Sequence, residues 1–217
     1  IICCPRLDDL EGSYASLMAF LESGTGKSIP VCILFNNEEI GSRTQQGADS
    51  TFLYDTLKRI AFSLELSEEY FLRLLAASFM ASCDNAHGTH PNYPELADRQ
   101  NSPSLNKGIV IKFNSSGHYG TDDLSAAFFK MICDKAGVPY QHYYVNADLR
   151  CGSTLGYISE SHVSITIADV GLPQLSMHSC LETAGAKDMD YMISALKILF
   201  ESYGERYGHE LTLDEIG

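Results

Sequence analysis

Short, continuously apolar runs alternate along the chain with longer segments in which apolar residues recur at helical spacing. The most apolar run, Ile29–Phe35, is continuous rather than alternating, which is typical of a strand covered on both faces. Further strands are predicted over residues 1–4 (also buried), 108–113, 141–145 and 164–168, and helices over 10–21, 52–64, 67–75, 124–135 and 188–203. This alternation predicts a three-layer α/β/α domain with helices on both faces of a sheet.

The composition allows a sizeable core and limits the partners of the chain. Hydrophobic residues make up 45% of the 217 residues and no repeat or low-complexity linker divides them, so we expect one domain. The formal net charge of −13 disfavours general binding to nucleic acid or to an anionic membrane, because those partners are negative too. The longest apolar run has seven residues, which is too few to span a bilayer.

The seven cysteines are an odd number and include no Cys-x-x-Cys pair. A disulfide framework is not expected in a chain that already has a core. We therefore expect reduced, mostly buried thiols and a cytoplasmic location.

Acidic and imidazole side chains follow several of the predicted strands. Asp8 comes after the first strand, Glu38 and Glu39 after the second, Asp84 after a short apolar stretch, and His178 after residues 171–177. Taken singly, these residues are ordinary turn formers, solvated charges or a structural histidine. Ligands of open α/β sheets collect beyond strand ends, so the same residues can converge on one site. Carboxylates and imidazole without cysteine then predict a divalent metal, with zinc the leading candidate.

Six motifs in order carry a resemblance to a known family. They occupy residues 5–10, 37–42, 84–93, 110–112, 151–156 and 177–179, with the sequences PRLDDL, NEEIGS, DNAHGTHPNY, VIK, CGSTLG and MHS. The chain resembles the aspartyl aminopeptidase family of dinuclear zinc exopeptidases from residue 5 to about residue 200. Any one motif alone would be weak, whereas six in order are specific.

The resemblance implies a role for each residue of the predicted metal site. Asp8 would bridge two zinc ions, Glu39 and His178 would complete one of them, and Asp84 would bind the other. Glu38 would remain free of metal and act as the general base, which suits a carboxylate within reach of a metal-activated water. Its neighbour Glu39 has a different task, so irregular backbone is needed there, and Gly41 permits it.

The resemblance also implies a substrate pocket. His87, Lys112 and Tyr119 match family positions that contact the peptide, and Lys112 would pair with an acidic N-terminal residue. The alternative for Lys112 is a side chain that reaches from a strand end to solvent. Other readings are a preference for neutral residues, a non-catalytic metal-binding or assembly module, and a related metal-dependent deacylase or carboxypeptidase.

Two features of the family are not found in the chain: a zinc-ligand histidine upstream of the first motif, and an inserted domain that drives oligomerisation. Residues 1–217 are therefore expected to be the C-terminal portion of a metallopeptidase catalytic domain, and a homo-oligomer is expected of the full-length protein. We expect the isolated chain to hold at most one metal ion well and to be weakly active or inactive, where the full-length protein holds two. We also expect it to expose an unpaired sheet edge and apolar surface.

Overall fold

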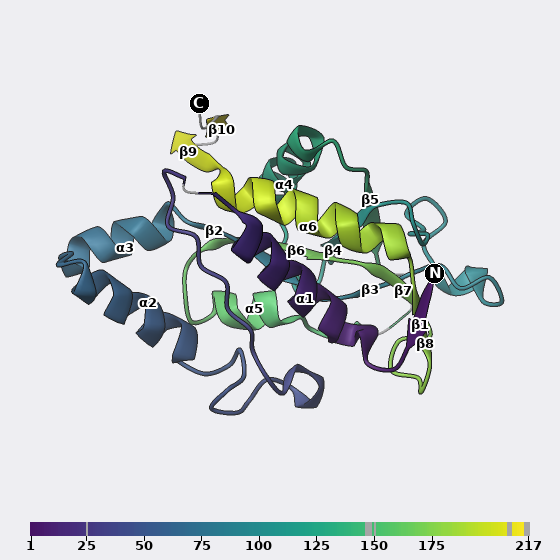
Figure 1. The fold of residues 1–217 in the computed structure, drawn as a ribbon. Helices are drawn as coiled ribbons and strands as arrows, with labels where there is room; N and C mark the ends of the chain where they lie inside the picture. Colours follow the sequence, from purple (N-terminus) through teal and green to yellow (C-terminus); the bar gives the residue numbers. More distant parts are fainter. Residues whose placement is uncertain (25, 146–148, 150, 208–209, 215–217) are drawn as a thin grey trace.

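The chain forms a central sheet and a second sheet that extends to one side of it, where the N-terminus lies (Figure 1). The structure, a computed structural model, describes residues 1–24, 26–145, 149, 151–207 and 210–214. The main sheet has the strand order β2-β6-β4-β5, with bounds Phe79–Cys83, Thr166–Gly171, Ile109–Phe113 and Tyr140–Tyr144. β2 runs parallel to β6 and β4 runs parallel to β5, whereas β4 and β6 are antiparallel. The second sheet has the order β1-β8-β7-β3, with bounds Ile2–Cys4, Glu182–Ala184, Pro173–Leu175 and Ala86–His87.

Helices cover both faces of the main sheet, as the alternating sequence pattern predicts. On one face α1, α4 and α6 pack side by side, with bounds Leu7–Glu22, Asp123–Ala136 and Ala186–Glu201 (Figure 1). Their core includes Ile109 and Ile111 of β4, so the alternation of a strand sends Val110 and Lys112 to the opposite face. That face carries α5, with bounds Leu155–Glu160, against β2 and β6. The predicted α/β/α class is thus confirmed.

A second, smaller core lies beside α2 and α3, with bounds Phe52–Ser63 and Glu68–Ala76. Both helices fall where the apolar spacing predicts them. Ser67 caps α3, because its side chain accepts a hydrogen bond from the backbone N–H of Tyr70. The remaining elements are two 3₁₀ turns, η1 and η2, and the hairpin β9-β10, with bounds Glu38–Ile40, Pro94–Leu96, Tyr203–Tyr207 and Glu210–Asp214.

The prediction of a buried strand over Ile29–Phe35 is wrong. These residues pair with no strand among the described residues, and Ile29 and Leu34 are 58% and 50% exposed. Only part of the run, including Ile33 and Phe35, packs against the smaller core. An apolar run becomes a strand only when a neighbouring chain segment accepts and donates its backbone hydrogen bonds, and sequence hydrophobicity carries no information on that partner.

Three smaller predictions need correction. β1 is not buried, because the side chains along it alternate between half-buried and exposed. The last helix begins at Ala186 and not at Asp188, so Asp188 lies within its first turn, where it is fully buried. The cysteines are all free, but only Cys133 is buried, and both Cys3 and Cys180 are exposed. No helix among the described residues combines the length and the apolarity needed to cross a membrane.

Candidate metal centre

Three chain segments bring Asp8, Glu39 and His178 together. The Nε2 atom of His178 lies 3.0 Å from Asp8 Oδ2 and 3.0 Å from Glu39 Oε2. The Asp8 side chain is 5% exposed, whereas those of His178 and Glu39 are 62% and 51% exposed. The triad therefore has a closed side at Asp8 and an open side toward solvent.

Asp8 also belongs to a second triad, with Asp9 and Asp84. One carboxylate oxygen from each of the three residues lies within 4.8 Å of the other two. Asp84 directly follows β2, and its Oδ2 accepts a hydrogen bond of 2.9 Å from Lys112 Nζ. Asp8 is thus the residue common to the two triads, which is the place the sequence resemblance implies for a bridging carboxylate.

The backbone at these positions is irregular. Arg6, which precedes the Asp8 turn, has a φ of 61°, and His178 itself has a φ of 66°. In the 37–42 loop Asn37, Gly41 and Ser42 also have left-handed φ values of 63°, 97° and 60°. Residues other than glycine adopt this conformation at a cost, so the surrounding contacts must fix these turns.

The 37–42 loop separates its two glutamates. Glu38 and Glu39 lie on the single turn η1, which Gly41 closes by donating its N–H to the Glu38 carbonyl at 2.8 Å. Glu39 is part of the first triad, whereas Glu38 belongs to neither triad. The sequence prediction that the two neighbours are placed differently therefore agrees with the geometry.

Crowding and burial raise the pKa values of the central carboxyl groups. Burial, followed by the charge of Asp84, raises the pKa of Asp8 to about 9. The same two causes raise the pKa of Asp9 well above its ordinary value. Burial and then Asp84 raise the pKa of Glu38 to about 7. Lys112 lowers all three pKa values, but not enough to reverse them.

The donor set fits a divalent cation. Asp8 Oδ1 and Asp9 Oδ1 are buried without a hydrogen-bond partner among the described residues, and such atoms are costly to leave unsatisfied. A cation would satisfy both oxygens and offset the repulsion that raises the pKa values. Ligand atoms of a tetrahedral zinc ion lie about 3.3 Å apart. A charged His178 would explain the first triad as an ion pair, but it would leave the orphaned oxygens unexplained.

Lys112 is a buried cation, so the alternative of a side chain extending to solvent is wrong. The residue is 2% exposed. Burial lowers its pKa, but the charges of Asp84 and Asp169 outweigh this, and the net shift is upward. Asp169 is fully buried on β6 and accepts hydrogen bonds from the hydroxyl of Thr154 and the N–H of Gly120. Lys112 is therefore paired with Asp84, and the charge of the buried Asp169 also favours its ionised form.

The other two predicted pocket residues, Tyr119 and His87, have different surroundings. Lys112 Nζ sits 5.6 Å from the centre of the Tyr119 ring, and the Tyr119 hydroxyl oxygen lies 3.2 Å from Cys151 Sγ. Burial, and then the Cys151 contact, raises the pKa of Tyr119. His87 ends β3 on the exposed side, with its ring centre 6.3 Å from that of Tyr143.

Sequence reasoning missed Asp9, Asp169 and Glu182. Asp9 stands next to Asp8 in the sequence, and that adjacency was the only available signal. Asp169 lies inside a strand, where it looks like a solvent-facing polar residue. Glu182 is 2% exposed and accepts backbone hydrogen bonds from Asp8 and His178. No spacing rule connects residues 8 and 182.

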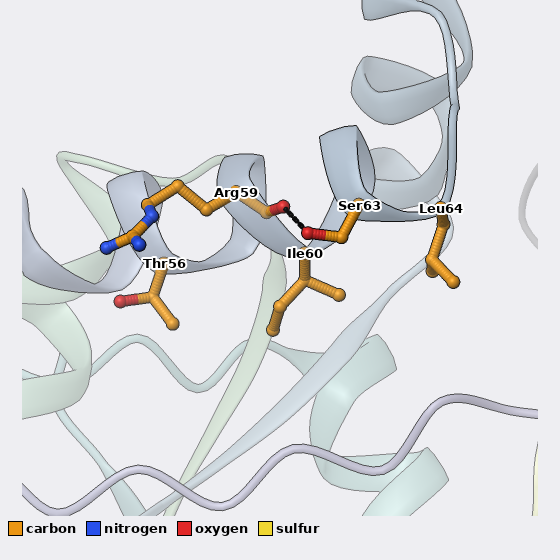
Figure 2. A pocket seen from close by; sticks show the side chains of 5 residues that line it. All are labelled: Thr56, Arg59, Ile60, Ser63 and Leu64. Atoms are coloured by element: carbon orange, nitrogen blue, oxygen red, sulfur yellow. Dashed lines mark hydrogen bonds between the residues drawn. The ribbon is translucent and has the colours of Figure 1, made fainter.

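A separate hollow of about 350 Å³ lies on α2 and contains none of these side chains (Figure 2). It is lined by Thr56, Arg59, Ile60, Ser63 and Leu64. Ser63 donates its hydroxyl to the backbone carbonyl of Arg59 at 2.9 Å, so this hydroxyl is used within the helix itself.

Taken together, the α/β/α fold and the two triads, one of which includes a histidine, are typical of a domain that can hold divalent metal ions. More particularly, the chain belongs to the aminopeptidase I zinc metalloprotease (M18) family, whose sequence pattern matches residues 1–200. The resemblance to zinc exopeptidases in the sequence is thereby confirmed.

Relatives and solved structures agree with this assignment. A probable M18 family aminopeptidase 2 from Clostridium novyi is 45% identical over 192 residues, which are 88% of this chain and 44% of the relative. A cryo-EM structure of an Ape4 and Nbr1 complex is 34% identical with a TM-score of 0.81, over 92% of this chain and 39% of that one. The mApe1 dodecamer of S. cerevisiae is 28% identical with a TM-score of 0.76, over 91% and 45%. The chain thus spans less than half the length of the relatives that it matches.

Proposed function

We propose that the chain is the metal-binding part of a zinc aminopeptidase that removes N-terminal residues from peptides. The observation that carries this proposal is the placement of Asp8 in both triads, with orphaned oxygens on Asp8 and Asp9. Membership of the M18 family supports zinc as the metal. Two ions sharing Asp8 are proposed for the full-length protein.

Each residue of the site has a proposed task. Asp8, Glu39 and His178 would hold one ion, and Asp8 with Asp84 would hold the other. Bound zinc makes water acidic enough to supply a hydroxide near neutral pH. Glu38 would accept the proton of that water and return it to the leaving amine, which suits a carboxyl whose pKa is raised to about 7.

An acidic N-terminal residue is the proposed substrate preference, because Lys112 places a buried positive charge beside the triads. An apolar substrate side chain would leave such a charge without a partner from the substrate. His87 and Tyr119 are proposed to line the same pocket.

One observation favours a second candidate, a preference for neutral residues. Lys112 Nζ already lies 2.9 Å from Asp84 Oδ2, so its charge is paired within the protein. If the role of Lys112 is to neutralise Asp84, it does not select for a carboxylate on the substrate.

The assembly and the location are proposals too. The solved mApe1 relative is a dodecamer, which supports a homo-oligomer for the full-length protein. The isolated chain is proposed to hold one ion well, at the triad that includes a histidine. The cytoplasm is the proposed location, in keeping with seven unpaired cysteines.

The test is an assay in which the zinc-loaded full-length protein hydrolyses chromogenic amides of Asp, Glu or Leu. Cleavage of the Asp and Glu amides in preference to Leu supports the first candidate, and Leu as the best substrate supports the second. Bound zinc without turnover of any amide, including in the full-length protein, would instead favour a non-catalytic metal-binding module. Activity on substrates whose α-amino group is blocked would favour a deacylase or carboxypeptidase.

A further inference from the structure

Glu182 joins the two turns that carry Asp8 and His178. Its Oε2 accepts the backbone N–H of Asp8 at 3.1 Å, and its Oε1 accepts the backbone N–H of His178 at 2.6 Å. One carboxylate therefore receives a hydrogen bond from each of two residues whose side chains meet at 3.0 Å. These residues are 170 positions apart in the sequence, and Glu182 is the connection between their backbones.

The position of Glu182 is itself rigid. It begins β8, the strand between β1 and β7 in the second sheet, and it stands opposite Cys4 in the pairing with β1. β1 leads within four residues to Asp8, and the loop from β7 to β8 contains His178. The carboxylate thus projects from a paired strand into the space between the two turns, where it is 2% exposed.

The backbone conformations of both turns are energetically unfavourable, so contacts from elsewhere in the fold must stabilise them. Arg6 and His178 have φ values of 61° and 66°, in the left-handed region that residues with a side chain seldom occupy. The two bonds to Glu182 hold each backbone N–H and hence the orientation of each side chain.

We infer that Glu182 is a positioning residue for the metal centre: by accepting both N–H groups, it sets the spacing between Asp8 and His178 and raises the affinity for the ion that they share. The inference rests on the proposed function, because it concerns the same site. A carboxylate is required there, since Gln has one acceptor oxygen and would turn an amide N–H₂ toward the second N–H.

The test compares Glu182→Gln with a matched control, Asp188→Asn. Asp188 is also fully buried and also accepts two backbone N–H groups, from Asn106 and Gly108, but it touches no residue of the triads. Zinc affinity is measured by calorimetry on the metal-free 217-residue chain, and Co²⁺ absorption spectra report the geometry of the bound ion. We expect E182Q to weaken zinc binding about 10- to 100-fold and to change the Co²⁺ spectrum. We expect D188N to lower the melting temperature while leaving both metal readouts unchanged.

Zinc affinity within twofold of the parent in E182Q would overturn the inference and leave the proposed function standing. Failure of the unsubstituted chain to bind zinc would remove the proposed function, and the inference with it. If E182Q does not fold, amide hydrogen exchange on the unsubstituted chain decides the question. Slow exchange at both Asp8 and His178 is expected, and exchange as fast as in exposed loops would overturn the inference.

Discussion

Asp8 is the residue that both triads of the candidate metal centre share. It is nearly buried, it contacts His178, and it shares the second triad with Asp84. Water cannot stabilise its charge there, so the folded chain either binds a proton at Asp8 or binds a cation. This choice is the physical basis for the predictions at the scale of single residues.

Removing His178 should weaken the first triad. His178→Ala is expected to lower zinc affinity at least about tenfold, because the ion loses its imidazole ligand. Isothermal titration calorimetry on the metal-free chain measures this, with His90→Ala as the control, since His90 belongs to neither triad. Equal losses in the two variants would contradict the assignment of His178 as a ligand.

Glu38 should affect turnover and not metal binding. Glu38→Gln keeps the size of the side chain but removes its ability to accept a proton, so kcat is expected to fall by about 10²- to 10⁴-fold. Zinc content, measured by mass spectrometry of the metal, is expected to stay unchanged. A parallel fall in zinc content would place Glu38 among the ligands instead. Because this chain spans less than half the length of its relatives, kcat is measured on the full-length protein.

The stability of the metal-free chain should depend on pH through Asp8. Its pKa rises on folding from 3.8 to about 9, because burial and the charge of Asp84 disfavour the ionised form. The folded chain then binds a proton that the unfolded chain releases, so the free energy of unfolding falls as pH rises from about 4 to 9. Urea denaturation at pH 5 and pH 8, with chelator present, measures this fall. Asp8→Asn should reduce the difference between the two pH values, and an unchanged difference would contradict the role of Asp8.

At the scale of elements, β6 holds the turn after β2 in place through a close contact. Val170 accepts the backbone N–H of Asp84, and a Cβ added at Gly171 would lie 2.0 Å from the Asp84 carbonyl oxygen. The absence of a side chain at Gly171 therefore lets the turn that carries Asp84 approach the strand.

Gly171→Ala should move Asp84 and destabilise the sheet. Forcing a methyl group into this contact is expected to cost about 1–3 kcal/mol in the free energy of unfolding. Gly152→Ala is the matched control, because a Cβ there meets nothing within 4 Å. Thermal denaturation and zinc titration of both variants provide the measurement. A G171A variant with unchanged stability and zinc affinity would contradict the importance of this close contact.

At the scale of the whole molecule, the candidate metal centre brings together the first turn of α1, the 37–42 loop and the β7-β8 loop. These segments are far apart in the sequence, so an ion that binds them all stabilises the folded state against the unfolded one. The exposed apolar side chains of the 29–35 run belong to neither triad.

Removing the metal should lower the melting temperature of the whole chain. At a free zinc concentration of 100 times Kd, the stabilisation is about 2.7 kcal/mol, which corresponds to roughly 5–10 °C for a domain of this size. Calorimetry with zinc and then with excess EDTA measures the difference. A melting temperature that EDTA leaves unchanged would mean that the folded chain does not bind zinc in preference to the unfolded chain.

The sequence by itself predicted the longer helices α1, α2, α3, α4 and α6 but not the short α5. A helix makes its hydrogen bonds within one segment, and in a long helix the apolar spacing reports the buried face directly. It also predicted Asp8, Glu39, Asp84 and His178 as site residues, since the ordered motifs of the family contain them. The convergence of Asp8, Glu39 and His178, and of Asp8 and Asp84, is visible only in the fold.

Tertiary structure alone decided three matters. The 29–35 run formed no strand because strand pairing depends on a partner segment, which local hydrophobicity does not specify. Lys112 became a buried, paired cation because the turn after β2 brings Asp84 to it and β6 brings the charge of Asp169 near it. Glu182 came to connect Asp8 with His178 because β8 lies beside β1, and a contact between residues so distant in the chain depends on the packing of the sheet.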